Sequence, residues 1–125
     1  MVQRVDPASL APELAEPTQA RLSAILVAFQ AAQGAPPGQT RTHAQAERLA
    51  IELVARIRAG EDMAALARTH DDDLGGRVRS GDLGWIRRRS PQIPALFDPV
   101  FGLPSGQVQD PIASDWGWII LRRER

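Results

Sequence analysis

The chain has 125 residues, a length typical of one domain and sufficient to bury a hydrophobic core. Its 15 basic residues, all arginine, balance 15 acidic residues, and this neutral charge disfavours nucleic-acid binding, which normally depends on an excess of basic residues. The absence of lysine and cysteine excludes Schiff-base chemistry, disulfides and thiolate metal ligands.

The first 19 residues contain three prolines and no sustained apolar period, so we expect an extended leader or linker over 1–19 and one domain over 20–125. No apolar run approaches the roughly 20 residues of a membrane-spanning helix, and the N-terminus lacks a secretory signal pattern. We therefore expect a soluble chain without membrane insertion. Its compartment stays open, since it could be cytoplasmic or a domain of a longer exported protein.

Residues 21–29 form an apolar, β-branched run of strand length, and the Gly- and Pro-rich loop after it ends the strand. From Thr42 the apolar residues recur at helical spacing, with a capping box between Thr42 and Gln45 and a C-terminal cap at Gly60. A second, shorter helix is predicted over 62–69.

An acidic cluster, Asp71 to Asp73, follows the second helix, where carboxylates oppose the helix dipole. A strand is predicted from the Gly-Asp-Leu-Gly-Trp run at 81–85. Ser90 and Pro91 resemble the cap and first residue of a short helix, which Pro94 and Pro99 should fragment. Two extended runs, 108–113 and 118–123, then form a hairpin around a four-residue turn. The order of elements indicates an α+β domain.

Three stretches resemble the parvulin family of peptidyl-prolyl cis-trans isomerases. They are IRAGEDMAALARTHDDD (57–73), SGDLGWI (80–86) and FDPVFGLPSGQVQDPIASDWGWIIL (97–121). The resemblance implies a four-stranded antiparallel sheet surrounded by about four helices. It also implies a shallow apolar cleft that receives the proline of an extended peptide, and a reaction that needs no cofactor and no metal.

The proline pocket of the family is formed by an aliphatic side chain and a phenylalanine four residues later. Ile93 and Phe97 match that spacing, and Phe101 is predicted to form an additional wall. Trp85, at the aromatic position of the Gly-Asp-Leu-Gly-aromatic signature, is a further candidate for substrate binding. Each could instead be an ordinary core residue, which is the more common place for a phenylalanine.

Two candidate catalytic residues follow from the resemblance. Asp73, seven residues after Leu66, corresponds to the acid or cysteine that faces the isomerising amide; alternatively it is a solvated loop acid like Asp71 and Asp72. Ser114 corresponds to the hydroxyl residue in the turn before the last strand, although a turn serine often only caps its own turn.

The family usually places two histidines at the centre of its site, and both are absent. Ala24 stands at the first position and Ile119 at the second. Joint replacement by apolar residues avoids leaving one buried imidazole without its partner. His43 and His70 lie in helical segments, show no metal-ligand spacing and are interpreted as structural or solvent-facing. The absence of basic residues directly after the first strand predicts no preference for phosphorylated substrates.

The expected function is therefore isomerisation of X-Pro bonds in unfolded or extended polypeptides, assisting protein folding, with activity reduced by the loss of both histidines. The alternative is a catalytically inactive peptide-binding or chaperone module of the same fold. A third hypothesis, nucleic-acid binding by the arginine run 87–89, is disfavoured by the neutral net charge. We expect a monomer whose partners are proline-containing segments of client proteins.

Overall fold

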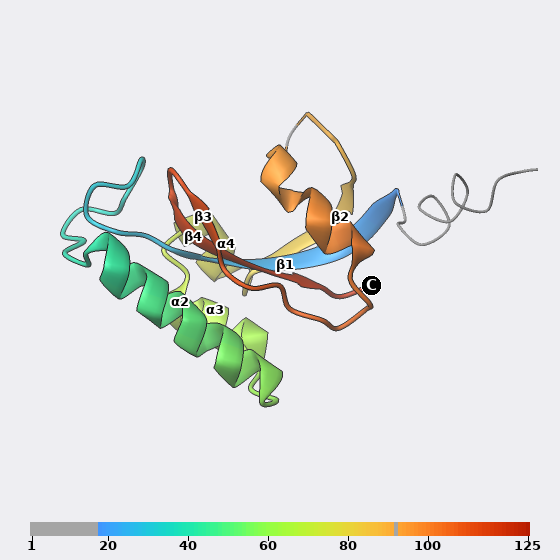
Figure 1. Cartoon of the computed structure of the whole chain (residues 1–125), viewed down its shortest axis with the longest axis horizontal. Coiled ribbons are helices and arrows are strands. Elements are labelled where there is room, and N and C mark those ends of the chain that lie inside the picture. The colour runs from blue at the N-terminus through green and yellow to red at the C-terminus, as the bar shows by residue number, and fades with distance from the viewer. Residues whose placement is uncertain (1–17, 92) are drawn as a thin grey trace, which may run out of the picture.

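The computed structural model describes residues 18–91 and 93–125, which form a four-stranded antiparallel sheet of order β2-β1-β4-β3 with helices on both faces (Figure 1). The strands are β1 (Gln19–Val27), β2 (Asp82–Arg87), β3 (Ile112–Ser114) and β4 (Gly117–Arg123). The helices are α2 (His43–Arg58), α3 (Met63–His70), α4 (Leu74–Val78) and a 3-10 helix, η1 (Ala95–Gly102). The predicted α+β fold is confirmed.

Strand β1 divides the core into two parts because alternate side chains of a strand point to opposite faces of the sheet. Ile25 and Val27 pack with α2 and α3 on one face. Ala20 and Leu22 pack with η1 on the other. Figure 1 shows α2 below the sheet and η1 above it. The predicted leader lies almost wholly outside the described residues, and β1 begins at Gln19, two residues before the predicted strand.

Helix α2 forms where its periodicity and caps predict it. The Thr42 side chain accepts a hydrogen bond from the backbone N–H of Gln45, and the Gln45 side chain accepts one from the N–H of Thr42. The helix ends at Arg58, and Gly60 has a φ of 106°, a backbone conformation that glycine adopts without steric cost. Helix α3 follows with Asp62 as its N-cap.

The acidic cluster is not the solvated helix end that the sequence predicted. Asp73 is the N-cap of an unpredicted helix, α4, so its carboxylate faces the favourable N-terminal end of a helix. The two glycines of α4 concealed it, because glycine has low helix propensity. Asp71 is only 2 % exposed, which contradicts its interpretation as a solvated acid.

The segment after β2 also differs from the prediction. Ser90 and Pro91 do not begin a helix; η1 begins at Ala95 with Pro94 as its N-cap, and Pro99 lies inside it. A 3-10 helix lacks the α-helical hydrogen-bond ladder that an interior proline would interrupt. The C-terminal hairpin is present, but β3 (Ile112–Ser114) includes only the last two residues of the predicted run 108–113, since Pro111 directly precedes the strand.

Candidate functional site

A cavity of about 770 Å³ opens on the face of the sheet that carries η1. Ile93, Pro94 and Phe97 form one apolar wall, and Leu83 and Ile86 of β2 continue it. The structure thus brings Ile93 and Phe97 into one cleft, at the spacing on which the sequence interpretation depended. This cavity is the cleft of the proline site that the resemblance implies, and we call it the cleft.

The floor of the cleft consists of residues from β1 and β4. Ala24, Leu26 and Ile119 line it. Leu26 is paired directly with Ile119, and Ala24 is paired with Leu121, so positions 24 and 119 are diagonal neighbours on the same face of the sheet. The two positions at which the family usually carries histidine are therefore adjacent here, and apolar side chains occupy both.

The opposite wall is polar, since Asp71, Asp72 and Asp73 all line the cleft. One carboxylate oxygen of Asp71, Oδ1, accepts hydrogen bonds from the backbone N–H groups of Leu26 and Asp73, each at 3.0 Å. Burial, which disfavours the charged form, raises the pKa of Asp71 to about 6 despite these hydrogen bonds. No sequence signal distinguishes this buried carboxyl from the other two.

The other two carboxylates have separate partners. Asp72 forms an ion pair with Arg41 at 2.8 Å and accepts a hydrogen bond from the N–H of Ala28 at 2.8 Å, so it ties the loop after β1 to the acidic segment. Asp73 is exposed at the cleft and accepts a hydrogen bond from the N–H of Gly75 at 3.2 Å. Its carboxylate therefore has a capping role in addition to its place beside the cleft.

Ser114 lies outside the lining of the cleft. Its hydroxyl donates to the carbonyl oxygen of Gly117 at 2.7 Å and accepts from the N–H of Trp116 at 3.2 Å, which closes the hairpin turn. It lines a separate surface hollow of about 580 Å³ together with His43 and Phe29. The geometry matches the turn-capping alternative more closely than a position facing a bound amide.

Two predicted binding residues also lie outside the cleft. Phe101 is fully buried in the core cluster on the η1 face. Trp85 is 60 % exposed and stands opposite Arg21 in the β1–β2 pair. Since Arg21 follows the buried Ala20 in β1, its side chain and that of Trp85 point away from the η1 face.

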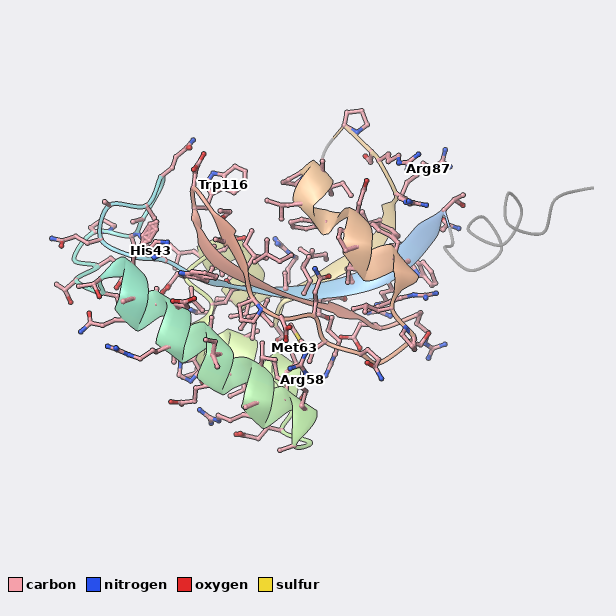
Figure 2. All side chains as sticks on the ribbon, viewed as in Figure 1. His43, Arg58, Met63, Arg87 and Trp116 are labelled. Carbon is pink, nitrogen blue, oxygen red and sulfur yellow. The ribbon has the colours of Figure 1, made fainter. Side chains whose placement is uncertain are left out.

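The rim of the cleft contains residues that the sequence did not single out. The loop at 33–37, with Pro36 and Pro37, lines one side, and Trp116 lines the cleft from the tip of the β3–β4 hairpin. Figure 2 shows Trp116 at that tip, on the side of the sheet where η1 lies. A hydrogen bond of 2.8 Å from the N–H of Gln33 to the carbonyl of Asp115 joins loop and hairpin. This contact joins two segments that are about 80 residues apart in the sequence.

The histidines do not contribute to the cleft. The His43 ring lies between Phe29 and Trp118, with ring centroids 4.9 and 5.3 Å away. His70 ends α3 and is half-buried. Within residues 18–91 and 93–125, no group of three or more His, Asp and Glu side chains has an arrangement suited to a metal ion. In the same ranges, no helix is long and apolar enough to span a bilayer.

Comparison with protein-family models matches residues 10–123 to the PPIC-type PPIase domain. The chain belongs to this family, whose members are parvulin-type peptidyl-prolyl isomerase domains. Among curated proteins, the chaperone SurA of Pseudomonas fluorescens is 36% identical over 85 residues, which are 68% of this chain and 20% of that protein. SurA of Chromohalobacter salexigens is 38% identical over 84 residues, 67% of this chain and 19% of that protein. The chain thus spans about a fifth of the length of these relatives.

Solved structures agree with the family assignment. The peptidyl-prolyl isomerase ESS1 from Candida albicans superposes with a TM-score of 0.80 at 25% identity, covering 94% of this chain and 72% of that one. The parvulin domain of PpiD from E. coli shares the fold, with a TM-score of 0.62 at 24% identity over 88% of this chain and 89% of that chain. The four-stranded parvulin-like sheet expected from the sequence is confirmed.

Proposed function

We propose that the cleft binds X-Pro segments of extended or unfolded polypeptides and accelerates their cis-trans isomerisation at a reduced rate. The observation that carries this proposal is the continuous apolar surface formed by Ile93 and Phe97 on the wall and Ala24 and Ile119 on the floor. Such a surface accommodates a pyrrolidine ring, and the family to which the chain belongs supports the assignment.

The reaction requires rotation about a partly double C–N bond, with a barrier of about 18–20 kcal/mol. A protein lowers it by binding the twisted amide more tightly than the planar one. In this chain, Phe97 and Ile93 would hold the proline ring while the desolvated floor around Ile119 weakens solvation of the planar amide dipole. No covalent step is needed, so a cleft without a nucleophile is sufficient.

We expect a reduced isomerisation rate because the floor of the cleft is apolar. Alanine and isoleucine have no hydrogen-bonding side-chain group, so positions 24 and 119 cannot donate to the rotating amide as imidazoles could. Asp71 and Asp73 are the titratable side chains left beside the floor with no arginine partner in the described part of the chain. Asp73 thus stays a catalytic candidate, whereas Ser114 would act only through the hairpin turn that it closes.

The apolar floor also favours a second candidate function, a peptide-binding module without isomerase activity. The curated relatives are named as chaperones, and a domain that holds proline-containing segments of client proteins would fit such a role. In that case the cleft and its affinity are the same, but the bound proline exchanges between cis and trans no faster than the free peptide does.

Exchange NMR on an Ala-Leu-Pro-Phe peptide separates the two functions. We expect cis-trans exchange faster than the uncatalysed process, which takes tens of seconds, together with chemical-shift changes at Ile93 and Phe97. Shift changes without faster exchange would support the binding module instead. Absence of both would refute the proposal.

Two substitutions locate the binding site in the same assay. Phe97→Ala should abolish the shift changes because it removes most of the apolar wall. Trp85→Ala removes an exposed aromatic that lies outside the lining of the cleft and should leave peptide affinity unchanged. Loss of affinity in Trp85→Ala would move the binding surface to the opposite face of the sheet.

A further inference from the structure

The cleft has a one-sided distribution of charge. Among the described residues that line it, three are aspartates and none is arginine or histidine. Arg41 already neutralises Asp72 through an ion pair of 2.8 Å. The two remaining carboxylates, those of Asp71 and Asp73, have no cationic partner within 4.0 Å among the described residues. The Arg77 guanidinium lies nearby but donates to the backbone carbonyl of Asp71, at 3.0 Å, and not to its side chain. An occupant of the cleft therefore meets two carboxylates without an ion-pair partner on one wall.

Asp71 adds an observation beyond the acidic cluster. Its side chain is almost completely buried, and both of its hydrogen bonds end on Oδ1. The second oxygen, Oδ2, accepts no hydrogen bond from any described residue, and it is not among the fully buried atoms that lack a partner. A carboxylate that is so strongly desolvated gains more from a charged donor than an exposed one does.

Gly76 makes room for this free oxygen. A Cβ atom at position 76 would collide with Oδ2 of Asp71, so the helix α4 can pass the carboxyl only because glycine stands there. Gly76 itself lines the cleft. Asp71 and Gly76 both line the cleft, so this carboxyl meets the cleft beside a backbone position without a side chain.

We propose that the cleft selects proline segments in which a positively charged side chain, arginine or lysine, directly precedes the proline, and that Oδ2 of Asp71 receives this charge. The proposal rests on the peptide-binding function proposed above. The proline ring occupies the wall of Ile93 and Phe97, and the basic side chain extends along the floor to Asp71.

The remaining surface of the cleft suits such a side chain. The aliphatic stem of arginine can cover Leu74, which is 67 % exposed at the cleft, while its guanidinium reaches a carboxylate. The partly exposed ring of Trp116 offers a further contact for a cation. An acidic or phosphorylated residue at the same peptide position would be repelled by Asp71 and Asp73.

The test compares three peptides, Ala-Arg-Pro-Phe, Ala-citrulline-Pro-Phe and Ala-Glu-Pro-Phe, by NMR titration of the whole chain. Citrulline has nearly the shape of arginine without its charge. We expect arginine to be bound about tenfold more tightly than citrulline, equivalent to about 1.4 kcal/mol, and glutamate more weakly than both. Asp71→Asn should abolish the preference, so that arginine and citrulline peptides are bound equally, while the affinity for the citrulline peptide stays the same.

Two matched variants remove the same charge elsewhere. Asp110→Asn acts on an exposed carboxylate outside the cleft and should keep the tenfold preference. Asp73→Asn should lower it only slightly. Equal affinities for arginine and citrulline, or a preference that survives in Asp71→Asn or disappears in Asp110→Asn, would overturn the proposal.

A measurement on the unsubstituted chain keeps the proposal testable if Asp71→Asn does not fold. The carboxyl carbon resonance of Asp71 should shift on titration with the arginine peptide and remain in place with the citrulline peptide; identical responses would contradict the proposal. If no peptide shifts the resonances of Ile93 and Phe97, the peptide-binding function itself fails. Binding of citrulline without a preference for arginine refutes the charge selection alone.

Discussion

The two faces of the sheet differ in how completely helices cover them. On one face, α2 and α3 pack over Ile25 and Val27, which are fully buried. On the other face, the eight-residue η1 covers only the end of the sheet near Ala20 and Leu22, and the floor beyond it remains open as the cleft. One strand, β1, thus contributes alternate residues to a stabilising core and to a candidate binding surface. Substitutions on the closed face should therefore change mainly stability, and substitutions on the open face should change mainly peptide binding.

The largest expected effect is on stability, at the closed face. Leu53 of α2 is fully buried, and Leu53→Ala should lower the free energy of unfolding by about 2–5 kcal/mol, through lost apolar contacts and the cavity that remains. Urea unfolding at neutral pH measures it, and the peptide affinity of the folded fraction should not change. A loss of affinity with preserved stability would mean that the two faces are coupled.

The second effect concerns Asp71, the buried carboxyl at the wall of the cleft. Its pKa rises from 3.8 to about 6 on folding, so the folded chain holds this proton to a higher pH than the unfolded chain does. The contribution of Asp71 to stability is therefore greatest below about pH 4 and falls as the pH rises to about 6, by about 3 kcal/mol in total. Asp72 and Asp73 raise this pKa further by their charges.

Asp71→Asn keeps an oxygen that can accept from the N–H groups of Leu26 and Asp73 but has no charge to bury. We expect it to raise the free energy of unfolding at pH 7 and to flatten its pH dependence between pH 4 and 7. Unfolding titrations at a series of pH values provide the measurement. An unchanged slope in the variant would show that other groups dominate this range.

The third effect concerns the floor of the cleft. Ala24→His alone places an imidazole among apolar neighbours, and we expect it to cost about 1–3 kcal/mol of stability because one polar group is left unpaired. Ala24→His with Ile119→His lets the two diagonal neighbours form a hydrogen bond, recovering part of that cost. The double variant should also raise the isomerisation rate about tenfold, the value of one transition-state hydrogen bond of about 1.4 kcal/mol.

Protease-coupled or exchange assays and unfolding measurements on Ala24→His, Ile119→His and the double variant, beside the original chain, test that expectation. A double variant that is as stable as the original but no faster would indicate that the floor does not limit the rate. A double variant less stable than the sum of the single changes would contradict the predicted contact between positions 24 and 119.

The smallest effect is expected at the cap of α4. Asp73→Ala removes the acceptor for the N–H of Gly75 and should cost about 0.5–2 kcal/mol, as is usual for a lost N-cap. Asp73→Asn should cost much less, because asparagine also accepts at an N-cap. Comparing both variants for stability and for isomerase activity separates the capping role of Asp73 from a catalytic one.

Local patterns were sufficient for much of the fold. Helices α2 and α3, the hairpin and the parvulin resemblance could all be predicted, since helical periodicity, capping residues and turn residues act over a few neighbouring positions. Helix α4 could not, because two glycines hide a helix that depends on its cap and on tertiary contacts. The site was predicted in part: Ile93, Phe97, Ala24 and Ile119 share the cleft, whereas Phe101, Trp85 and Ser114 lie outside its lining.

The sequence by itself determined the family, the two missing imidazoles and the alternation that assigns each residue of β1 to a face, because these properties are encoded in residue types and short spacings. Only the tertiary structure decided which of three consecutive aspartates is buried, and that the loop at 33–37 meets the hairpin turn at the rim of the cleft. Burial and desolvation depend on contacts between segments that are far apart in the chain, such as Leu26 and Asp71. A local sequence pattern carries no information about such contacts.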